Sequence, residues 1–106
     1  MYRLTTPTHQ FNVVMDPREW EKFVISYSQC DKIILEKTEQ DNVEIVAQSE
    51  EGPFALKVKL SQEETQLFSS KDIAYVQLRC KYNNGDCFAT EKMAFKVEDP
   101  INQTVL

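Results

Sequence analysis

The residues of this chain that could support acid–base, nucleophilic or metal chemistry are few and scattered. The single histidine, His9, has no second histidine or cysteine near it at metal-ligand spacing. Glu63 and Glu64 are adjacent, so on a helical turn their carboxylates point apart and cannot share a substrate as an acid and base pair does. The two glycines are isolated and cannot build a phosphate-binding loop. We therefore expect no catalytic site, no cofactor and no metal.

The three cysteines, Cys30, Cys80 and Cys87, are an odd set without a CxxC spacing. This usage favours reduced thiols over a disulfide framework, and we interpret them as small apolar residues of strands. Residues 1–10 contain no apolar stretch of the secretory type. We therefore expect synthesis in the cytosol, with the sequon at Asn102 accidental.

The charge pattern disfavours nucleic acid and membrane partners. The net charge is −5, the charges are interspersed, and no run of basic residues occurs, whereas phosphate binding needs clustered Lys and Arg. Lys57 and Lys59 lie on one predicted strand, and Arg79 and Lys81 on another. These four residues would form a basic stripe only if the two strands were neighbours. No stretch approaches the roughly 20 apolar residues that span a bilayer. We expect neither nucleic acid nor a membrane as a partner.

The length and the residue pattern predict a single β domain over residues 1–106. The chain has 42% apolar and 27% charged residues, which are ordinary values for a globular domain of this size. Apolar and polar residues alternate with the two-residue period of strands in one segment after another. The predicted strands are 9–15, 22–29, 32–37, 43–48, 54–60, 73–82 and 87–97.

The clearest strand begins at Phe54. Apolar residues at positions 54, 56, 58 and 60 predict a dry face, and positions 55, 57 and 59 a wet one. Ser61 follows, and its spacing of three residues from Glu64 is that of a capping box. We predict a short helix over 62–68 that brings Leu67 or Phe68 under the sandwich and makes the corner between two sheets.

A hairpin is predicted near the end of the chain. Asn84 and Gly85 favour a two-residue type I′ turn, which would pair position 82 with 87 and position 80 with 89. Cys80 and Cys87 would then be offset, so a disulfide across the turn is not expected. The apolar parity of the return strand changes near positions 91 and 92, which predicts a bulge.

These elements predict an all-β fold. It is an immunoglobulin-like antiparallel β-sandwich of about seven strands, with one short helical turn near residues 62–68. A small open or closed barrel is the main alternative. The term immunoglobulin-like describes architecture only, because Trp20 is expected in a connection rather than between the sheets and no cysteine pair spans them.

Aromatic residues and the last apolar residues are the candidates for an interface. Tyr and Trp dominate binding hot spots, and strand parity does not allow all the aromatic residues to lie on one interior face. The alternative is that cross-strand aromatic pairs simply cover an outer face. Apolar residues in 99–106 follow a Pro break and either seal the sandwich or dock onto a neighbour. The candidate interface residues are Trp20, Tyr27, Tyr75, Tyr82, Ile101 and Leu106.

Several segments resemble small proteins encoded among the structural genes of tailed phages and prophages. The matching stretches are TTPTHQF at 5–11, VISYSQ at 24–29, LEK at 35–37, VKLSQEET at 58–65 and VQLR at 76–79. A weaker similarity is to the immunoglobulin-like N-terminal domain of phage baseplate upper proteins. The stretch 42–54 is longer than that family pattern and predicts an extra edge hairpin. The resemblance implies a virion component with no enzymatic residues.

Three functions are compatible with these observations. The leading hypothesis is a non-enzymatic structural or protein-interaction module of a phage or prophage particle, in the tail, baseplate or head-tail region. It implies synthesis in the bacterial cytoplasm, a place in the virion, and other virion proteins or a second copy as partners. The alternative is a carbohydrate-binding β-sandwich, because exposed Tyr and Trp on a β-face can stack on sugars. A small hydrolase is a third hypothesis, and it would depend on His9.

Overall fold

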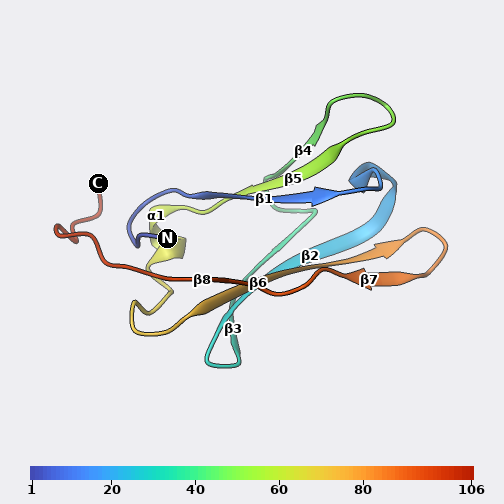
Figure 1. Ribbon diagram of the computed structural model, residues 1–106. Coiled ribbons are helices and arrows are strands. Elements are labelled where there is room, and N and C mark those ends of the chain that lie inside the picture. The colour runs from blue at the N-terminus through green and yellow to red at the C-terminus, as the bar shows by residue number, and fades with distance from the viewer.

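A computed structural model describes all 106 residues as two antiparallel β-sheets packed face to face (Figure 1). Eight strands, one 3-10 turn and one short helix make up the chain. Their bounds are β1 Thr8–Val13, η1 Pro17–Glu19, β2 Trp20–Gln29, β3 Lys32–Thr38, β4 Val43–Ala47, β5 Phe54–Lys59, α1 Gln62–Thr65, β6 Ala74–Tyr82, β7 Cys87–Ala89 and β8 Met93–Phe95. The predicted all-β sandwich is confirmed.

The strands divide between a small sheet and a large one. The small sheet has the order β1-β5-β4, and the large sheet has the order β3-β2-β6, with both β7 and β8 paired to β6. β7 and β8 are the two halves of the strand predicted over 87–97. Between them the register on β6 moves by one residue, from Arg79 opposite Ala89 to Val76 opposite Met93. This irregularity is the predicted bulge.

The pairing register of the β6–β7 hairpin differs from the predicted register. The N–H of Gly85 donates to the carbonyl of Tyr82 (3.0 Å), and Cys80 lies opposite Phe88. The loop therefore holds three residues, 83–85, and Gly85 takes the left-handed conformation that follows a type I turn in such loops. The predicted two-residue turn is wrong because Asn84 stays at negative φ, where its side-chain oxygen accepts from the N–H of Asp86 (2.9 Å).

A two-residue turn with positive φ lies instead between β2 and β3. Cys30 (φ 50) and Asp31 (φ 61) form it. Cys30 is therefore an exposed turn residue and not the apolar strand residue that we expected. Cys80 is buried on β6 as expected, Cys87 is exposed on β7, and all three thiols are free.

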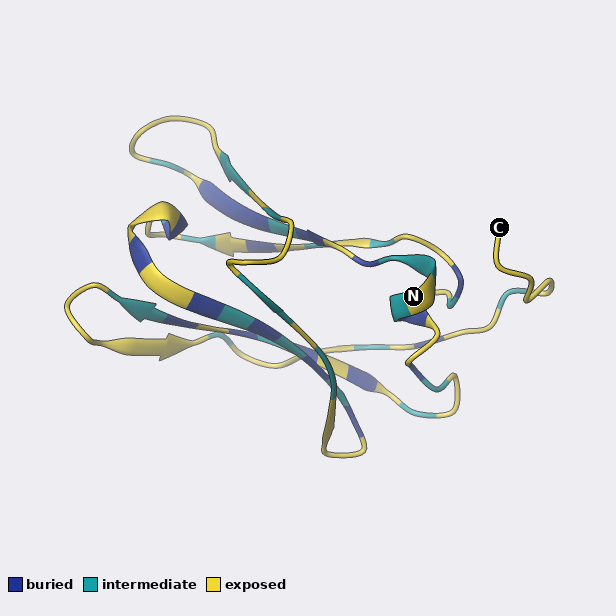
Figure 2. Cartoon of the chain, turned by 180° about the vertical axis from the view of Figure 1, so that it is seen from behind, coloured by how far each residue is buried: buried dark blue, intermediate teal, exposed yellow.

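The core lies between the sheets and is built from alternate residues of their inner faces, which appear dark blue in Figure 2. Position 55 departs from the predicted alternation. Ala55 is buried because β5 is the central strand of its sheet, where the small side chain lies between Asn12 of β1 and Val46 of β4. The main cluster comprises Phe11, Trp20, Phe23, Ile25, Tyr27, Leu56, Val58, Leu60, Phe68, Ala74, Val76, Leu78, Cys80 and Val97.

Helix α1 connects β5 of the small sheet to the large sheet, as predicted. The capping box is present: the hydroxyl of Ser61 accepts from the N–H of Glu64 (3.1 Å), and the carboxylate of Glu64 accepts from the N–H of Ser61 (2.9 Å). The α-helix ends at Thr65 rather than 68, because the N–H groups of Leu67 and Phe68 bond three residues back instead of four. This tighter turn buries Phe68 and leaves Leu67 on the surface.

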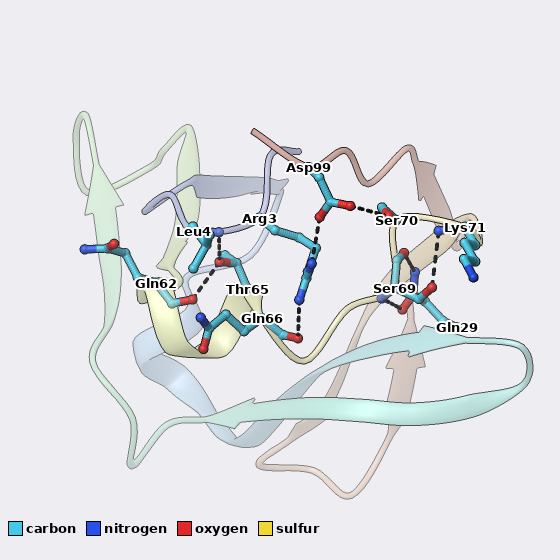
Figure 3. Close-up of polar contacts among 10 residues, drawn as sticks. All are labelled: Arg3, Leu4, Gln29, Gln62, Thr65, Gln66, Ser69, Ser70, Lys71 and Asp99. Atoms are coloured by element: carbon cyan, nitrogen blue, oxygen red, sulfur yellow. Dashed lines mark hydrogen bonds and ion pairs between the residues drawn. The ribbon is translucent and has the colours of Figure 1, made fainter. Parts of the chain in front are cut away.

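Polar contacts close the end of the sandwich that carries α1 (Figure 3). The buried amide of Gln29 accepts from the N–H of Ser69 (2.7 Å) and donates to the carbonyls of Ser69 (2.7 Å) and Asp72 (2.9 Å). Thr65 accepts from the N–H of Leu4 (2.8 Å). The strand end, the helix and the first residues of the chain are thereby held together.

A second contact ties the first residues to the residues after β8. Arg3 forms an ion pair with Asp99 (2.7 Å) and donates to the carbonyl of Gln66, and Ser70 donates to the other oxygen of Asp99 (2.7 Å). Tyr2 and Glu98 form a parallel bridge beside it. None of the helices is long and apolar enough to cross a membrane.

Candidate interaction surface

His9, the one histidine, lies in a mostly aromatic setting. It is half-buried on β1, where its Nδ1 and the hydroxyl of Tyr27 are hydrogen-bonded at 2.6 Å. The ring of Phe95 is 5.4 Å from the imidazole, centroid to centroid. Burial lowers the pKa of His9, and the ammonium group of Met1 lowers it further. Burial, and then the charge of Glu64, raise the pKa of Tyr27.

The lowered pKa of His9 predicts that the fold loses stability in mild acid. Above pH ~6.5 the imidazole is neutral in both the folded and the unfolded chain. As the pH falls through that value, the unfolded chain takes up a proton first, so the free energy of unfolding declines until His9 protonates in the folded chain too. Urea unfolding between pH 7.5 and 5.5 should show this decline, and His9→Gln should flatten it. An equal slope in the variant would contradict the assignment.

The adjacent carboxylates do not form a reactive pair. Glu64 caps α1 and forms an ion pair with Lys37 of β3. Burial alone would raise the pKa of Glu64, but hydrogen bonds from Lys37 and Ser61 outweigh it, so the pKa lies below its usual value. Glu63 is exposed. No three His, Cys, Asp or Glu side chains are grouped so that they could hold a metal ion.

A mostly apolar hollow forms a groove at the end of the sandwich away from α1. It has a volume of about 340 Å³ and lies between the end of β1 and the β6–β7 hairpin. β1 pairs only with β5, and β7 pairs only with β6, so each has one unpaired edge. Eight of its ten lining residues are apolar; the ten are Asn12, Val13, Val14, Met15, Trp20, Leu78, Cys80, Tyr82, Phe88 and Thr90. We call this hollow the edge groove.

Local turns position the outer wall of the edge groove. β1 ends at Val13 rather than at Met15, because Val13 lies opposite Phe54 and the preceding Pro53 has no N–H to extend the ladder. The chain then turns into η1, where the carboxylate of Asp16 accepts from the N–H of Arg18 (3.0 Å). Val14 and Met15 are left beside the groove without a strand partner, and Val14 is 92% exposed.

Trp20 forms the inner wall of the edge groove. We expected it in a connection, but it is the first residue of β2 and is only 9% exposed. The pairing register of β2 with β6 shifts between Trp20 and Lys22, and this shift turns the indole toward the core between the sheets. The ring lies 6.2 Å from Phe23, edge to face, and 6.2 Å from Tyr82.

One polar atom at the edge groove lacks a partner. The indole Nε1–H of Trp20 is buried and has no hydrogen-bond acceptor. Buried donors are nearly always paired, because an unpaired one loses its hydrogen bond to water without compensation. This donor belongs to a lining residue of the groove, but the atom itself is buried beneath the groove surface.

The structure separates the six predicted interface residues. Trp20 and Tyr82 meet in the edge groove. Tyr27 was expected on the surface, but it is fully buried, packed edge to face on Phe68 (5.7 Å). Trp20 is likewise buried, so the expected exposure is wrong for both. Tyr75 is partly exposed on the outer face of β6, and Ile101 and Leu106 are exposed at the opposite end of the molecule.

Val14 and Met15 were missed as interface residues by the sequence reasoning. The signal was the run of three consecutive apolar residues, Val13 to Met15, which breaks the alternation just before Asp16. One of three such residues must face outward in a strand. Phe88 also lines the groove, although it was not among the six predicted interface residues.

The four basic residues that could have formed a stripe are divided between the two sheets. Lys57 and Lys59 lie on β5, whereas Arg79 and Lys81 lie on β6. Lys81 is close to Glu21 (3.4 Å) and so meets an opposite charge on its own sheet.

No known protein family, curated protein or solved structure matches this chain.

Proposed function

We propose that this chain is a non-enzymatic protein-interaction module. The edge groove carries the proposal: it is apolar and it is flanked by two unpaired strand edges. Unpaired edges with an apolar hollow between them are the features that proteins use to bind extended segments of other proteins. The carboxylate of Glu64, by contrast, is engaged in a helix cap and an ion pair.

We further propose that the module is a structural component of a phage or prophage particle, in the tail, baseplate or head-tail region. The support is the resemblance of five short segments spread between residues 5 and 79, with other virion proteins or further copies as partners. An immunoglobulin-like assignment is supported by the strand order. β1-β5-β4 facing β3-β2-β6-β7 is the order that strands B, E, D and C′, C, F, G take in such domains.

The particle assignment predicts that the chain co-purifies with virions. After prophage induction, particles should be purified by density gradient and the chain measured by quantitative mass spectrometry. Val14→Glu with Phe88→Glu should remove the chain from particles, because two charges would enter the edge groove. Ile33→Glu is the control, since Ile33 is 63% exposed, a value between those of Phe88 and Val14, but lies on β3. Absence of the unmodified chain from particles would overturn the assignment.

A carbohydrate-binding function is the second candidate, and Tyr75 is the observation that favours it. Its partly exposed ring lies opposite Ser28, in a shallow hollow that also contains Gln77, Arg79 and Lys92. An aromatic face beside hydrogen-bonding side chains is a suitable platform for a sugar ring. A glycan array should detect binding that Tyr75→Ala abolishes, and a blank array would remove this candidate.

A further inference from the structure

The 100–106 segment has exposed apolar side chains and few hydrogen bonds to the rest of the molecule. Ile101 and Leu106 are fully exposed and Val105 is partly exposed. The only hydrogen bonds that tie the segment to the rest of the molecule run between the backbone of Leu106 and the side-chain amide of Gln62 (2.9 and 3.1 Å). Ile101 and Leu106 thus leave almost all of their apolar surface in solvent.

The 100–106 segment contains no charged side chain. Three stretches of seven or more consecutive residues lack a formal charge, counting His9 as neutral. Residues 4–15 contain β1, residues 23–30 fall within β2 and its turn, and the third is 100–106. In an extended strand Ile101 and Val105 would project from one side. The side chains of such a segment can enter an apolar groove without burying an unpaired side-chain charge.

The segment cannot reach the edge groove of its own molecule. The groove lies near Cys80, about 20 Å along β6 from Ala74 at a strand rise of ~3.3 Å per residue. Phe95 lies opposite Ala74, and the chain continues from there away from the groove (Figure 1). Seven extended residues span at most ~25 Å, and they would first have to reverse direction. Segment and groove therefore lie at opposite ends of a molecule that is 46 Å long.

We propose that the 100–106 segment of one copy binds in the edge groove of the next. It would lie as an added strand along the unpaired edge of β1, with Ile101 and Val105 against Phe88 and Met15. Because donor and acceptor sites are different surfaces, the contact is head-to-tail and yields open chains or rings. The inference deepens the proposed interaction function by naming its partner.

The experiment is a complementation test by sedimentation velocity. The segment variant is Ile101→Ser, Val105→Ser, Leu106→Ser, and the groove variant is Val14→Glu, Phe88→Glu. All these residues are at least partly exposed, so circular dichroism should show both variants folded. The unmodified chain should grow in mean mass with concentration, by about twofold or more, whereas each variant alone should stay at 12.4 kDa. An equimolar mixture of the two variants has one intact segment and one intact groove, so it should form a one-to-one pair and nothing larger.

Fluorescence gives a second readout. Trp20 is the only tryptophan, and its emission should change with association in the unmodified chain and in the mixture of variants. Ile33→Glu should associate like the unmodified chain. A monomeric unmodified chain, or a segment variant that still associates, would overturn the proposal; the latter would indicate groove-to-groove pairing. A chain that is monomeric yet present in particles would retain the proposed function and lose only this inference.

Discussion

Phe68→Ala should lower the free energy of unfolding by about 3 to 5 kcal/mol, which is the usual cost of removing a buried aromatic ring. Phe68 is only 2% exposed and lies edge to face on Tyr27, with Phe95 at 6.1 Å. Its removal would leave a cavity among side chains that come from α1, β2 and β8. Urea titration monitored by circular dichroism measures the change.

The neighbouring residue provides the control. Leu67 is 55% exposed, so Leu67→Ala should change the free energy of unfolding by less than about 0.5 kcal/mol. From the sequence, either Leu67 or Phe68 could have been the residue buried under the sandwich. This pair of variants distinguishes the two. Comparable losses from both would show that the turn after α1 does not place the two side chains as described.

Gln29→Leu should lower the free energy of unfolding by about 2 to 3 kcal/mol, because three backbone groups in the 69–72 loop would lose their partner. A leucine has nearly the same volume, so the lost hydrogen bonds and not a cavity determine the effect. The same urea titration measures it. Gln66→Leu is the control, because Gln66 is an exposed glutamine close by, and its substitution should be nearly neutral. A near-neutral Gln29→Leu would mean that the amide does not hold the loop.

Strand positions could be predicted from the sequence wherever alternation was regular. In β6, Ala74, Val76, Leu78 and Cys80 are all buried, as the two-residue period required. The capping box at Ser61 was equally readable, since it depends on two residues three positions apart. Both are local patterns, and the tertiary structure did not override them.

Tyr27 shows where residue type misled although the pattern was available. It has the same parity as Phe23 and Ile25, and all three are buried in β2. Classing it as an exposed aromatic gave more weight to its hydroxyl than to its position. The hydroxyl is compatible with burial because His9 provides a hydrogen-bond partner from the other sheet, and no sequence pattern links positions 9 and 27.

Trp20 and the edge groove could not have been predicted. Parity with Phe23 would place Trp20 on the outer side, and only the irregularity after it turns the ring inward. The three-residue loop after Tyr82 likewise depends on which φ Asn84 adopts, and both two-residue and three-residue loops accept Asn-Gly. The groove lies between these two irregular points. It therefore arises where local geometry departs from the regular period.

The pairing of β1 with β5 has a consequence for how fast the chain folds. Its closest paired residues, Val13 and Phe54, are 41 positions apart in the sequence, whereas β2 with β3 and β6 with β7 are local hairpins. Closing such a long loop costs conformational entropy before its contacts form. We therefore expect the small sheet to be completed late, and the whole chain to fold on the millisecond-to-second timescale of other β-sandwiches. During that interval β5 lacks its β1 neighbour, and a newly made chain is then most open to pairing with another strand.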